Sequence, residues 1–383
     1  MLALRPQVQR IAVQSSPSLW IQGAKAFSST ASVARAVSSG SATVNDNKVQ
    51  VKWNDGKSSR FHNFWLRDHC HCPECYHTVT KQRLFNTFQI PRDVQPASIE
   101  STTKGVDIIS WDISIRENLP QVEFGEVMET KEGLAKWLNN IHVYGFSMVN
   151  KVPVSTEATE KLAQRIAFIR ETHYGGFWDF TSDLGHGDTA YTDIALGAHT
   201  DNTYFTDPLQ MFHMLYHDGN GGDNLLVDGL QCAQVLKEKH PESYQTLSTL
   251  SIGAHCAGDK GTHIVPTPRR NPILKHDPFT GELVQIRFNN DDRSTINHLS
   301  SNQVEQLYDA LFDWNKILTD KRHELWTKFE PGTVIIFDNW RVLHGRSSFT
   351  GKRRMCGAYI NWDDYRSRWR TLNLAEDQLA RDL

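Results

Sequence analysis

Helical and strand-like hydrophobic periodicities follow one another along the chain from residue 130 onward. Thr130 precedes four apolar residues at helical spacing, so the pattern predicts a helix that begins there. The apolar face of this helix consists of Leu134, Trp137, Leu138 and Ile141. We expect a strand at 145–150 and a second helix over 155–171.

After residue 200, short apolar runs of strand length dominate the chain. Helical patterns interrupt them near 231–250 and 301–318. Many short strands joined by glycine-rich turns predict a mainly β fold with flanking helices, a barrel or sandwich of the jelly-roll kind. A Rossmann domain is disfavoured because no G-x-G-x-x-G follows a strand. We expect strands at 209–217, 224–229, 283–290, 332–338, 340–345 and 355–362.

The N-terminal part of the chain carries a different pattern. Apolar and polar residues alternate over 48–66 around Asn54-Asp55-Gly56, which predicts a β-hairpin. Residues 91–125 are rich in Pro, Gly, Asp and Ser and are interpreted as a linker between domains. A chain of 383 residues is long for one compact core. We therefore expect a small β domain over 46–115 and a larger domain over 116–383.

The first 45 residues are basic and contain no acidic residue before Asp46. They are also rich in Ser and Ala, a composition typical of an organelle transit peptide. We assign 1–45 to a mitochondrial transit peptide, exclude it from the fold and expect a matrix location; a disordered tail is the alternative. The net charge of −3 gives no reason to expect nucleic acid or a membrane surface as a partner. No apolar run is long enough to predict a membrane-spanning helix.

Candidate metal ligands occur in the stretch 196-LGAHTDNTYFTDP-208, where His199 and Asp201 are two positions apart. Such a pair needs a third ligand. His344, in 338-DNWRVLHGR-346, ends an apolar strand and is the favoured candidate, although it could instead be a core histidine satisfied by a backbone carbonyl. We expect His213 to pack in or beside the sheet. Two histidines and one carboxylate leave three positions of a metal ion open, as in non-haem Fe(II) oxygenases.

Arg353 lies nine residues after His344, on what should be the next strand. A fixed guanidinium beside an open iron site can bind a carboxylate through two hydrogen bonds. 2-Oxoglutarate chelates iron at one end and needs a cation for its far carboxylate, so Arg353 favours this co-substrate. Arg354 should point to the other face of the strand, because side chains alternate.

Four further segments carry a recognisable pattern: HTDNTYF (199–205), GGDNLLVDG (221–229), FDNWRVLHGR (337–346) and GAYINWDD (357–364). They resemble the butyrobetaine/trimethyllysine hydroxylase family of Fe(II)/2-oxoglutarate oxygenases, and the resemblance extends from about residue 48 to 370. It implies a double-stranded β-helix, which is a jelly roll, and a small N-terminal β domain. It further implies O2 as co-substrate, ascorbate, a homodimer and a 2-oxoglutarate site at Arg353. The iron ligands that it implies are His199, Asp201 and His344.

The resemblance also implies a substrate with a quaternary ammonium group, which is held by aromatic ring faces because it cannot donate a hydrogen bond. Asp188 matches a position where butyrobetaine hydroxylases carry Asn. An aspartate there would pair with the α-ammonium group of trimethyllysine. The alternative is that Asp188 only stabilises a turn of the backbone. Asn289 and Asn290 are expected to contact the substrate carboxylate. The implied cage consists of Tyr174, Trp178, Tyr191 and Tyr359.

The reaction implied by this branch of the family is hydroxylation of trimethyllysine at C3, with release of succinate and CO2, as the first step of carnitine biosynthesis. Butyrobetaine hydroxylase is the rival within the family. A zinc hydrolase would use the same three ligands without 2-oxoglutarate and would leave Arg353 unexplained. A non-catalytic jelly-roll binding module would keep the aromatic cage but would not need three metal ligands.

A second metal site is indicated by three cysteines just after the expected hairpin: Cys70, Cys72 and Cys75. Their spacing favours structural zinc, and unrelated buried thiols are the alternative. In the family a histidine from a later strand completes this site, but no histidine occurs between His77 and His142. We therefore expect an internally shortened N-terminal domain. The remaining candidates for a fourth ligand are His69, His71 and His77.

Overall fold

The structure is a computed structural model of the chain. Its contacts divide the chain into two units: residues 1–28, 32–107 and 374–383 form an N-terminal unit, and Ile108–Asn373 with Ser29–Ala31 form a larger unit. No helix among the described residues is long and apolar enough to cross a membrane. The described residues are 10–14, 39–45, 48–53, 58–68, 84, 87, 90, 98–102, 108–181, 193–205, 208–256, 263–265 and 271–379.

The N-terminal unit contains a three-stranded antiparallel sheet in the order β2-β3-β4. The pairing of β3 (Lys48–Trp53) with β4 (Ser58–His62) confirms the predicted hairpin. Val49 and Val51 of β3 are fully buried, as the alternating pattern requires. Helix α2 (Asn63–Asp68) follows β4 directly.

Two strands of this unit lie inside the segment 1–45 that we excluded from the fold. β1 (Arg10–Gln14) pairs in parallel with β5 (Ser98–Thr102), and β2 (Ser39–Asn45) pairs with β3. The backbones of β1 and β2 thus take part in sheet pairing in the full, uncleaved chain. The cleavage of a transit peptide stays a prediction. The three cysteines of the expected zinc site lie outside the described residues.

The larger unit begins within the segment 91–125, whose composition predicts a linker. It contains a short 3-10 helix η2 (Ile113–Asn118), strand β6 (Gln121–Glu123) and helix α3 (Phe124–Glu129). Trp111 is buried against Phe146, at 5.1 Å between ring centroids. The linker interpretation is thus wrong for residues 108–125, because burial by distant parts of the chain overrides a turn-rich composition.

Helices α4 and α5 follow the predicted periodicity. α4 (Lys131–Tyr144) begins after Thr130, whose hydroxyl accepts from the Gly133 N–H, and it ends at Gly145 in the left-handed conformation (φ 78°). α5 (Thr156–Ile166) ends before the predicted residue 171, because the chain becomes extended and β8 (Ile169–Arg170) joins a sheet.

The helical pattern near 231–250 forms two helices. α6 (Gly229–Lys239) ends before Pro241, which opens α7 (Pro241–Thr249), because proline has no N–H to continue the preceding helix. α8 (Ser301–Leu318) matches its prediction and has a capping box. The C-terminal helices are α9 (Trp362–Asn373) and α10 (Glu376–Leu379).

The larger sheet has the order β6-β7-β16-β11-β18-β8, and β9 also pairs with β18. It is antiparallel except for the β6–β7 pair. Its longer strands are β7 (Phe146–Asn150), β9 (Phe177–Thr181), β11 (Leu209–His217), β16 (Val334–Asp338) and β18 (Arg353–Ile360).

The smaller sheet is antiparallel, with the order β10-β17-β12-β15. A separate pair joins β13 (Leu274–His276) to β14 (Leu283–Ile286). The four strands of the smaller sheet are β10 (Leu196–His199), β12 (Asn224–Asp228), β15 (Leu325–Thr327) and β17 (Val342–Arg346).

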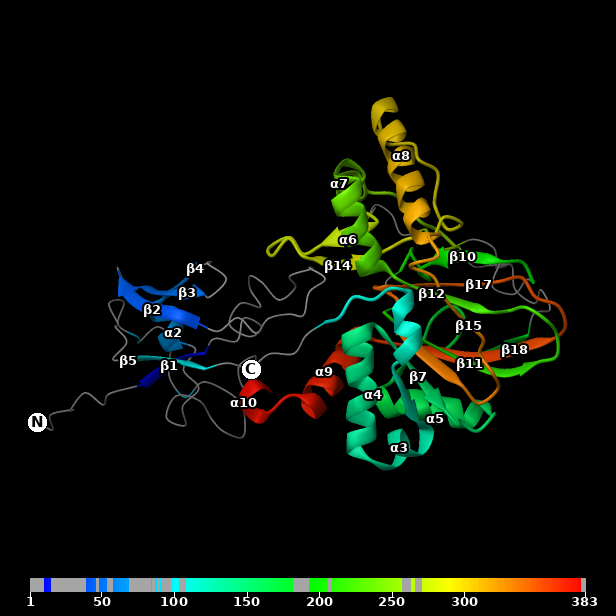
Figure 1. Ribbon diagram of the computed structural model, residues 1–383, viewed down its shortest axis with the longest axis horizontal. Helices are drawn as coiled ribbons and strands as arrows, with labels where there is room; N and C mark the ends of the chain where they lie inside the picture. The colour runs from blue at the N-terminus through cyan, green and yellow to red at the C-terminus, as the bar shows by residue number, and fades with distance from the viewer. Residues whose placement is uncertain are drawn as a thin grey trace, which may run out of the picture. The chain divides into compact units, whose positions relative to one another are not determined.

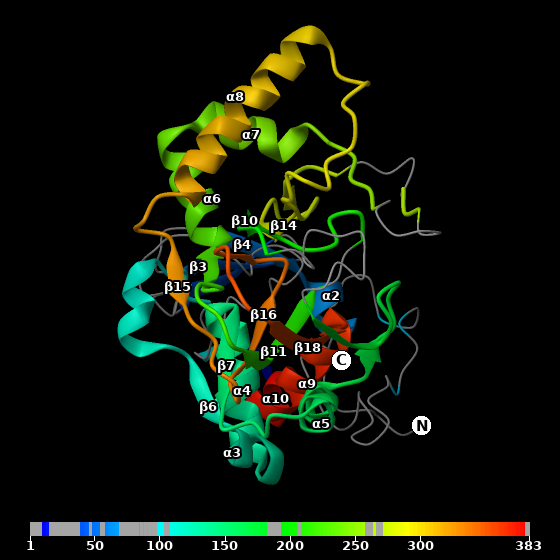
Figure 2. The same cartoon turned by 90° about the vertical axis from the view of Figure 1, so that its right-hand side faces the viewer.

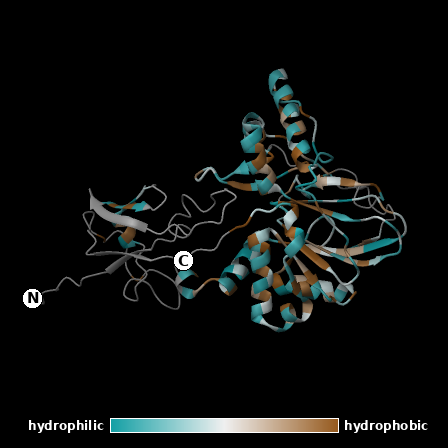
Figure 3. Cartoon of the chain, viewed as in Figure 1, coloured by the Kyte–Doolittle hydropathy of each residue, from teal (hydrophilic) through white to brown (hydrophobic). Residues whose placement is uncertain are grey.

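The two sheets of the larger unit pack face to face, and helices cover them from outside (Figures 1 and 2). One apolar core joins inward residues of both sheets, such as Leu226, Phe337 and Met355. A second core joins Leu225 and other outward residues of the smaller sheet to α6, α7 and α8. Figure 3 shows hydrophobic residues following the central strands. This arrangement confirms the predicted jelly roll with flanking helices.

Candidate active site

The three predicted metal ligands converge at one end of the smaller sheet. His199 is the last residue of β10 and lies opposite His344 of β17 in the strand register. Asp201 follows in a turn that Asn202 makes with a left-handed backbone (φ 52°), a conformation that Asn tolerates well. Asp201 Oδ1 lies 3.2 Å from His199 Nε2 and 3.6 Å from His344 Nε2. The three candidate donor atoms all lie within 4.8 Å of one another.

Neighbouring groups orient each of these side chains. His199 Nδ1 is 2.7 Å from the Gly197 carbonyl, so Nε2 faces Asp201. The His344 ring packs against Phe212 and Phe337, with centroid distances of 5.9 and 4.7 Å. The site is therefore pre-organised by strand register and ring packing.

The backbone of Asp201 is clamped by one side chain. Asn339 Oδ1 accepts from the Asp201 N–H at 2.8 Å, and Asn339 Nδ2 donates to the Asp201 carbonyl at 3.0 Å. The Asp201 carboxylate is held separately: its Oδ2 accepts from Gln210 Nε2 at 2.5 Å and from the Tyr359 hydroxyl at 3.0 Å. These four bonds fix both the backbone and the side chain of Asp201.

The electrostatics of the cluster favour the metal-binding protonation states of His344 and Asp201. Burial lowers the pKa of His344 to about 3, so its imidazole is neutral at neutral pH. Burial also opposes protonation of His199, but its hydrogen bond to Asp201 and the charge of Asp201 raise the pKa of His199 above its usual value. Burial acts to raise the pKa of Asp201, yet His344, His199 and Gln210 hold it well below its usual range. An ionised carboxylate thus faces at least one neutral imidazole.

The donor set fits a divalent first-row metal ion. Nitrogen and oxygen ligands stand about 2.0–2.2 Å from such an ion, so adjacent ligands lie about 3 Å apart. The 3.2 and 3.6 Å separations around Asp201 Oδ1 are close to that value. Two imidazoles and one carboxylate suit iron and leave positions open for other ligands.

Arg353 is a buried cation on the inward face of β18. Its guanidinium lies 5.6 Å from the Phe349 ring centroid and 3.4 Å from Asn224 Oδ1. Burial, with a smaller contribution from Arg346, lowers the pKa of Arg353 to about 9. Within the described ranges no carboxylate pairs with Arg353, and its buried Nε has no hydrogen-bond partner. Such a cation can bind an incoming carboxylate.

Arg354 points away from this pocket, as predicted. It is partly exposed and forms an ion pair with Asp179 of β9, with Nε 2.9 Å from Oδ1. His213 is also confirmed as a packing residue, because it is fully buried and its Nδ1 lies 2.6 Å from the Thr159 hydroxyl.

Two of the predicted cage aromatics lie together near the metal ligands. Trp178 of β9 is opposite Gly357 of β18, where any side chain would collide with the indole ring. The Trp178 ring centroid is 6.3 Å from that of Tyr359 and 5.2 Å from that of Phe212. Tyr174 contacts Tyr204, with 3.4 Å between their hydroxyls. The predicted substrate residues Asp188 and Tyr191 lie outside the described residues.

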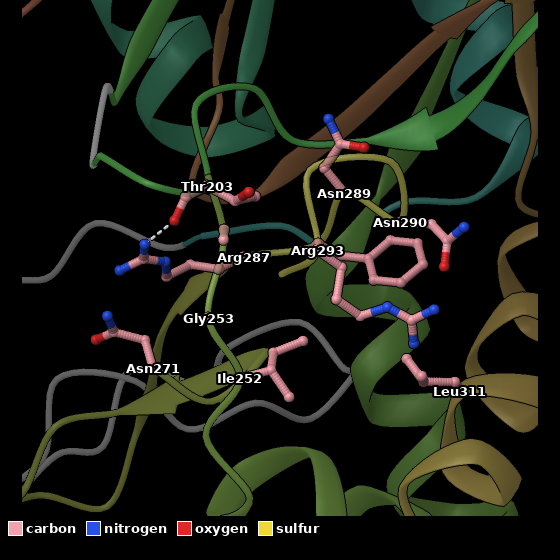
Figure 4. Close-up of a pocket in the computed structure, with 11 residues that line it drawn as sticks. Thr203, Ile252, Gly253, Asn271, Arg287, Asn289, Asn290, Arg293 and Leu311 are labelled. Atoms are coloured by element: carbon pink, nitrogen blue, oxygen red, sulfur yellow. Dashed lines mark hydrogen bonds between the residues drawn. The ribbon is translucent and has the colours of Figure 1, made fainter. Parts of the chain in front are cut away.

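A cavity of about 440 Å³ opens beside His199. Asn289 and Asn290 line it, together with residues of α8. A second cavity, of about 20 Å³, is drawn in Figure 4, where Arg287 donates to the Thr203 carbonyl. That volume holds about one water molecule, so of these two cavities in the described part of the chain the larger one can accept an amino acid.

Two residues of the site were missed by sequence reasoning. Asn339 stands within FDNWRVLHGR, and a polar residue directly after an apolar strand is a signal that could have found it. Gln210 is a buried polar residue in the apolar run 209–217, where an amide needs a partner.

Comparisons with known proteins agree with this geometry. Residues 113–359 match the taurine catabolism dioxygenase TauD, TfdA family, and residues 41–114 match the family described as gamma-butyrobetaine hydroxylase-like, N-terminal. A trimethyllysine dioxygenase of Meyerozyma guilliermondii is 42% identical over 85% of this chain and 94% of its own length. The mitochondrial trimethyllysine dioxygenase of Rattus norvegicus is 40% identical over 82% of this chain and 83% of its own.

A relative with a different name is more distant. A gamma-butyrobetaine dioxygenase of a Pseudomonas species is 29% identical over 84% of this chain and 92% of its own length. The chain therefore belongs to the TauD, TfdA dioxygenase family and, within it, to the trimethyllysine dioxygenases.

Proposed function

We propose that this chain hydroxylates N6,N6,N6-trimethyl-L-lysine at C3, with conversion of 2-oxoglutarate to succinate and CO2, the first step of carnitine biosynthesis. The observation that carries the proposal is the convergence of His199, Asp201 and His344 in a chain of this family. The three side chains would hold Fe(II). When bound, iron with 2-oxoglutarate and O2 supplies the oxidation that converts a C–H bond to C–OH.

The protein contributes geometry and charge. Arg353 would bind the far carboxylate of 2-oxoglutarate, because it is a buried cation whose neighbours Asn224 and Phe349 leave its charge uncompensated. The rings of Trp178 and Tyr359 would contact the quaternary ammonium group, each with an attraction of about 0.5–2 kcal/mol. This places one C–H bond of the substrate toward the metal.

Other substrate contacts are proposed from the family pattern and the larger cavity. Tyr174 and Tyr191 would complete the aromatic cage, and Asp188 would pair with the α-ammonium group. Asn289 and Asn290 would donate to the substrate carboxylate, which is supported by their place beside His199.

Replacing Arg353 with methionine is expected to raise KM for 2-oxoglutarate by about 10–150-fold, because charge-assisted hydrogen bonds worth about 1.5–3 kcal/mol are lost. KM for trimethyllysine should change little. Succinate release at varied 2-oxoglutarate measures both constants. Arg354→Met, at the neighbouring outward position, is the matched control, and equal KM values for the two variants would contradict the assignment.

A substrate panel tests the proposed reaction. Full-length chain with Fe(II), 2-oxoglutarate and ascorbate should release succinate and hydroxylated product with trimethyllysine, and far less with butyrobetaine. Asp188→Asn should lower this preference by about tenfold, the equivalent of about 1.4 kcal/mol. His199→Ala is the inactive control. Product without 2-oxoglutarate would favour a hydrolase, and preferred turnover of butyrobetaine would favour the rival hydroxylase.

Several finer expectations join the proposal. The mammalian relatives are named mitochondrial, which supports a mitochondrial location, and we propose the matrix. We also propose a homodimer, a requirement for ascorbate, and zinc bound by three cysteines in the N-terminal unit. Those cysteines are Cys70, Cys72 and Cys75.

A further inference from the structure

The two carboxylate oxygens of Asp201 have different surroundings. Oδ1 faces the imidazoles of His199 and His344, at 3.2 and 3.6 Å. Oδ2 faces the opposite way and accepts two hydrogen bonds, from Gln210 and Tyr359. The carboxylate therefore presents one oxygen to the candidate metal position and has the other engaged by the protein.

Gln210 and Tyr359 form a closed triangle with Oδ2. The two residues are directly opposite in the register of β11 and β18, and both side chains are buried. Gln210 Nε2 donates one hydrogen to Asp201 Oδ2 at 2.5 Å and the other to the Tyr359 oxygen at 3.0 Å. The Tyr359 hydroxyl then uses its own hydrogen on Oδ2 at 3.0 Å. All three bonds use compatible donors and acceptors.

The presence of a glutamine at position 210 lowers the stability of the fold, so packing alone does not explain it. Gln210 Oε1 is buried and has no hydrogen-bond partner within the described part of the chain. An unsatisfied buried carbonyl destabilises a fold, and an apolar side chain at this inward position would avoid the loss. The side-chain nitrogen of Gln210 thus donates to the Asp201 carboxylate, while the side-chain oxygen of Gln210 has no partner within the described residues.

We propose that Gln210 and Tyr359 are positioning residues that hold Oδ2, so that Asp201 offers Oδ1 alone to the metal. The inference rests on the proposed metal-binding role of Asp201. A carboxylate free to rotate no longer holds Oδ1 toward the metal, so metal binding weakens. When such a carboxylate does bind, both oxygens can turn to the metal and occupy a position that the co-substrate or O2 needs. The two residues thereby keep the metal centre open.

Tyr359 accordingly has two separable parts. Its ring lies near Trp178, as expected for the aromatic cage, while its hydroxyl bonds Asp201. Removal of the hydroxyl alone leaves the ring in place. The substitution Tyr359→Phe therefore separates the positioning of Asp201 from contact with the substrate.

The experiment is a titration of the full-length chain with Mn(II), in which free Mn(II) is followed by electron paramagnetic resonance without any substrate. Tyr359→Phe and Gln210→Leu should each raise the Mn(II) Kd by about 10–100-fold, the usual cost of removing a partner of a metal ligand. A Kd within about twofold of wild type for both variants would overturn the proposal.

Two exposed bonds of the same chemistry provide matched controls. Tyr216 donates its hydroxyl to Asp218 at 2.9 Å, and Gln234 donates its amide to Glu238 at 2.6 Å. Tyr216→Phe and Gln234→Leu should leave the Mn(II) Kd unchanged. If Gln210→Leu does not fold, as judged by its thermal melt, Tyr359→Phe decides the outcome alone.

A second readout uses turnover. In the positioning variants the ratio of succinate to hydroxylated product should rise, because a misplaced carboxylate disturbs the coupling of the two half-reactions. This readout fails if trimethyllysine is not the substrate, whereas the Mn(II) titration does not depend on any substrate. Failure of the proposed function and failure of the positioning role are therefore distinguishable.

Discussion

Replacement of His344 with alanine is expected to lower kcat/KM for trimethyllysine hydroxylation by about a thousandfold or more, the equivalent of about 4 kcal/mol. The reason is the loss of one of only two imidazoles that face Asp201 within the cluster. Mn(II) affinity should fall in the same variant. The measurements are succinate release under saturating 2-oxoglutarate and a Mn(II) titration.

His298→Ala is a suitable control for this loss. His298 is exposed, and its Nε2 lies 2.8 Å from the Ser251 carbonyl, away from the cluster. Its replacement should leave kcat/KM unchanged. If His344→Ala kept more than about a tenth of the wild-type kcat/KM, His344 could not be an essential metal ligand.

The largest expected effect on stability comes from a buried ion pair. Arg341 binds Asp228 through Nε at 3.1 Å and through Nη2 at 2.8 Å, and its Nη1 donates to the Val143 carbonyl. Both partners are almost fully buried. Arg341→Met should lower the free energy of unfolding by about 3–5 kcal/mol, because Asp228 becomes an uncompensated buried charge.

Urea unfolding of the full-length chain measures this loss. The exposed pair of Arg354 and Asp179 offers the comparison, and Arg354→Met should cost at most about 1 kcal/mol. Arg341→Met combined with Asp228→Asn should be less destabilised than Arg341→Met alone, since the orphaned charge is gone. Equal free energies of unfolding for Arg341→Met and Arg354→Met would show that the buried pair is not a stabilising contact.

Local sequence signals predicted much of the fold. The bounds of α8 follow from a capping box at Ser300 and an unbroken helical period, and β11 follows from a mostly apolar run of strand length. The short strands β9, β10 and β15 were not predicted. They exist because they pair with β18, β17 and β12, and such long-range pairing leaves no periodic trace in three to five residues.

The same division holds for the site. His199, Asp201 and His344 could be found by residue type and spacing, since metal ligands are chemically distinctive. Outside the site, the burial of Trp111 could not be predicted in this way, because it depends on the hydrogen bond from its backbone N–H to Asp228, more than a hundred residues away. Likewise, the family resemblance implies only an aromatic cage role for Tyr359, whereas the register of β18 against β11 places its hydroxyl on the Asp201 carboxylate.

The site is divided between the two sheets. The smaller sheet supplies His199 and His344, while Gln210, Arg353 and Tyr359 belong to the larger one. A chain whose sheets have not closed on each other has the histidines without the residues that orient the carboxylate. Tight metal binding therefore requires a chain whose two sheets have closed on each other. The ratio of bound metal ion to chain then measures the fraction of correctly folded molecules in any preparation.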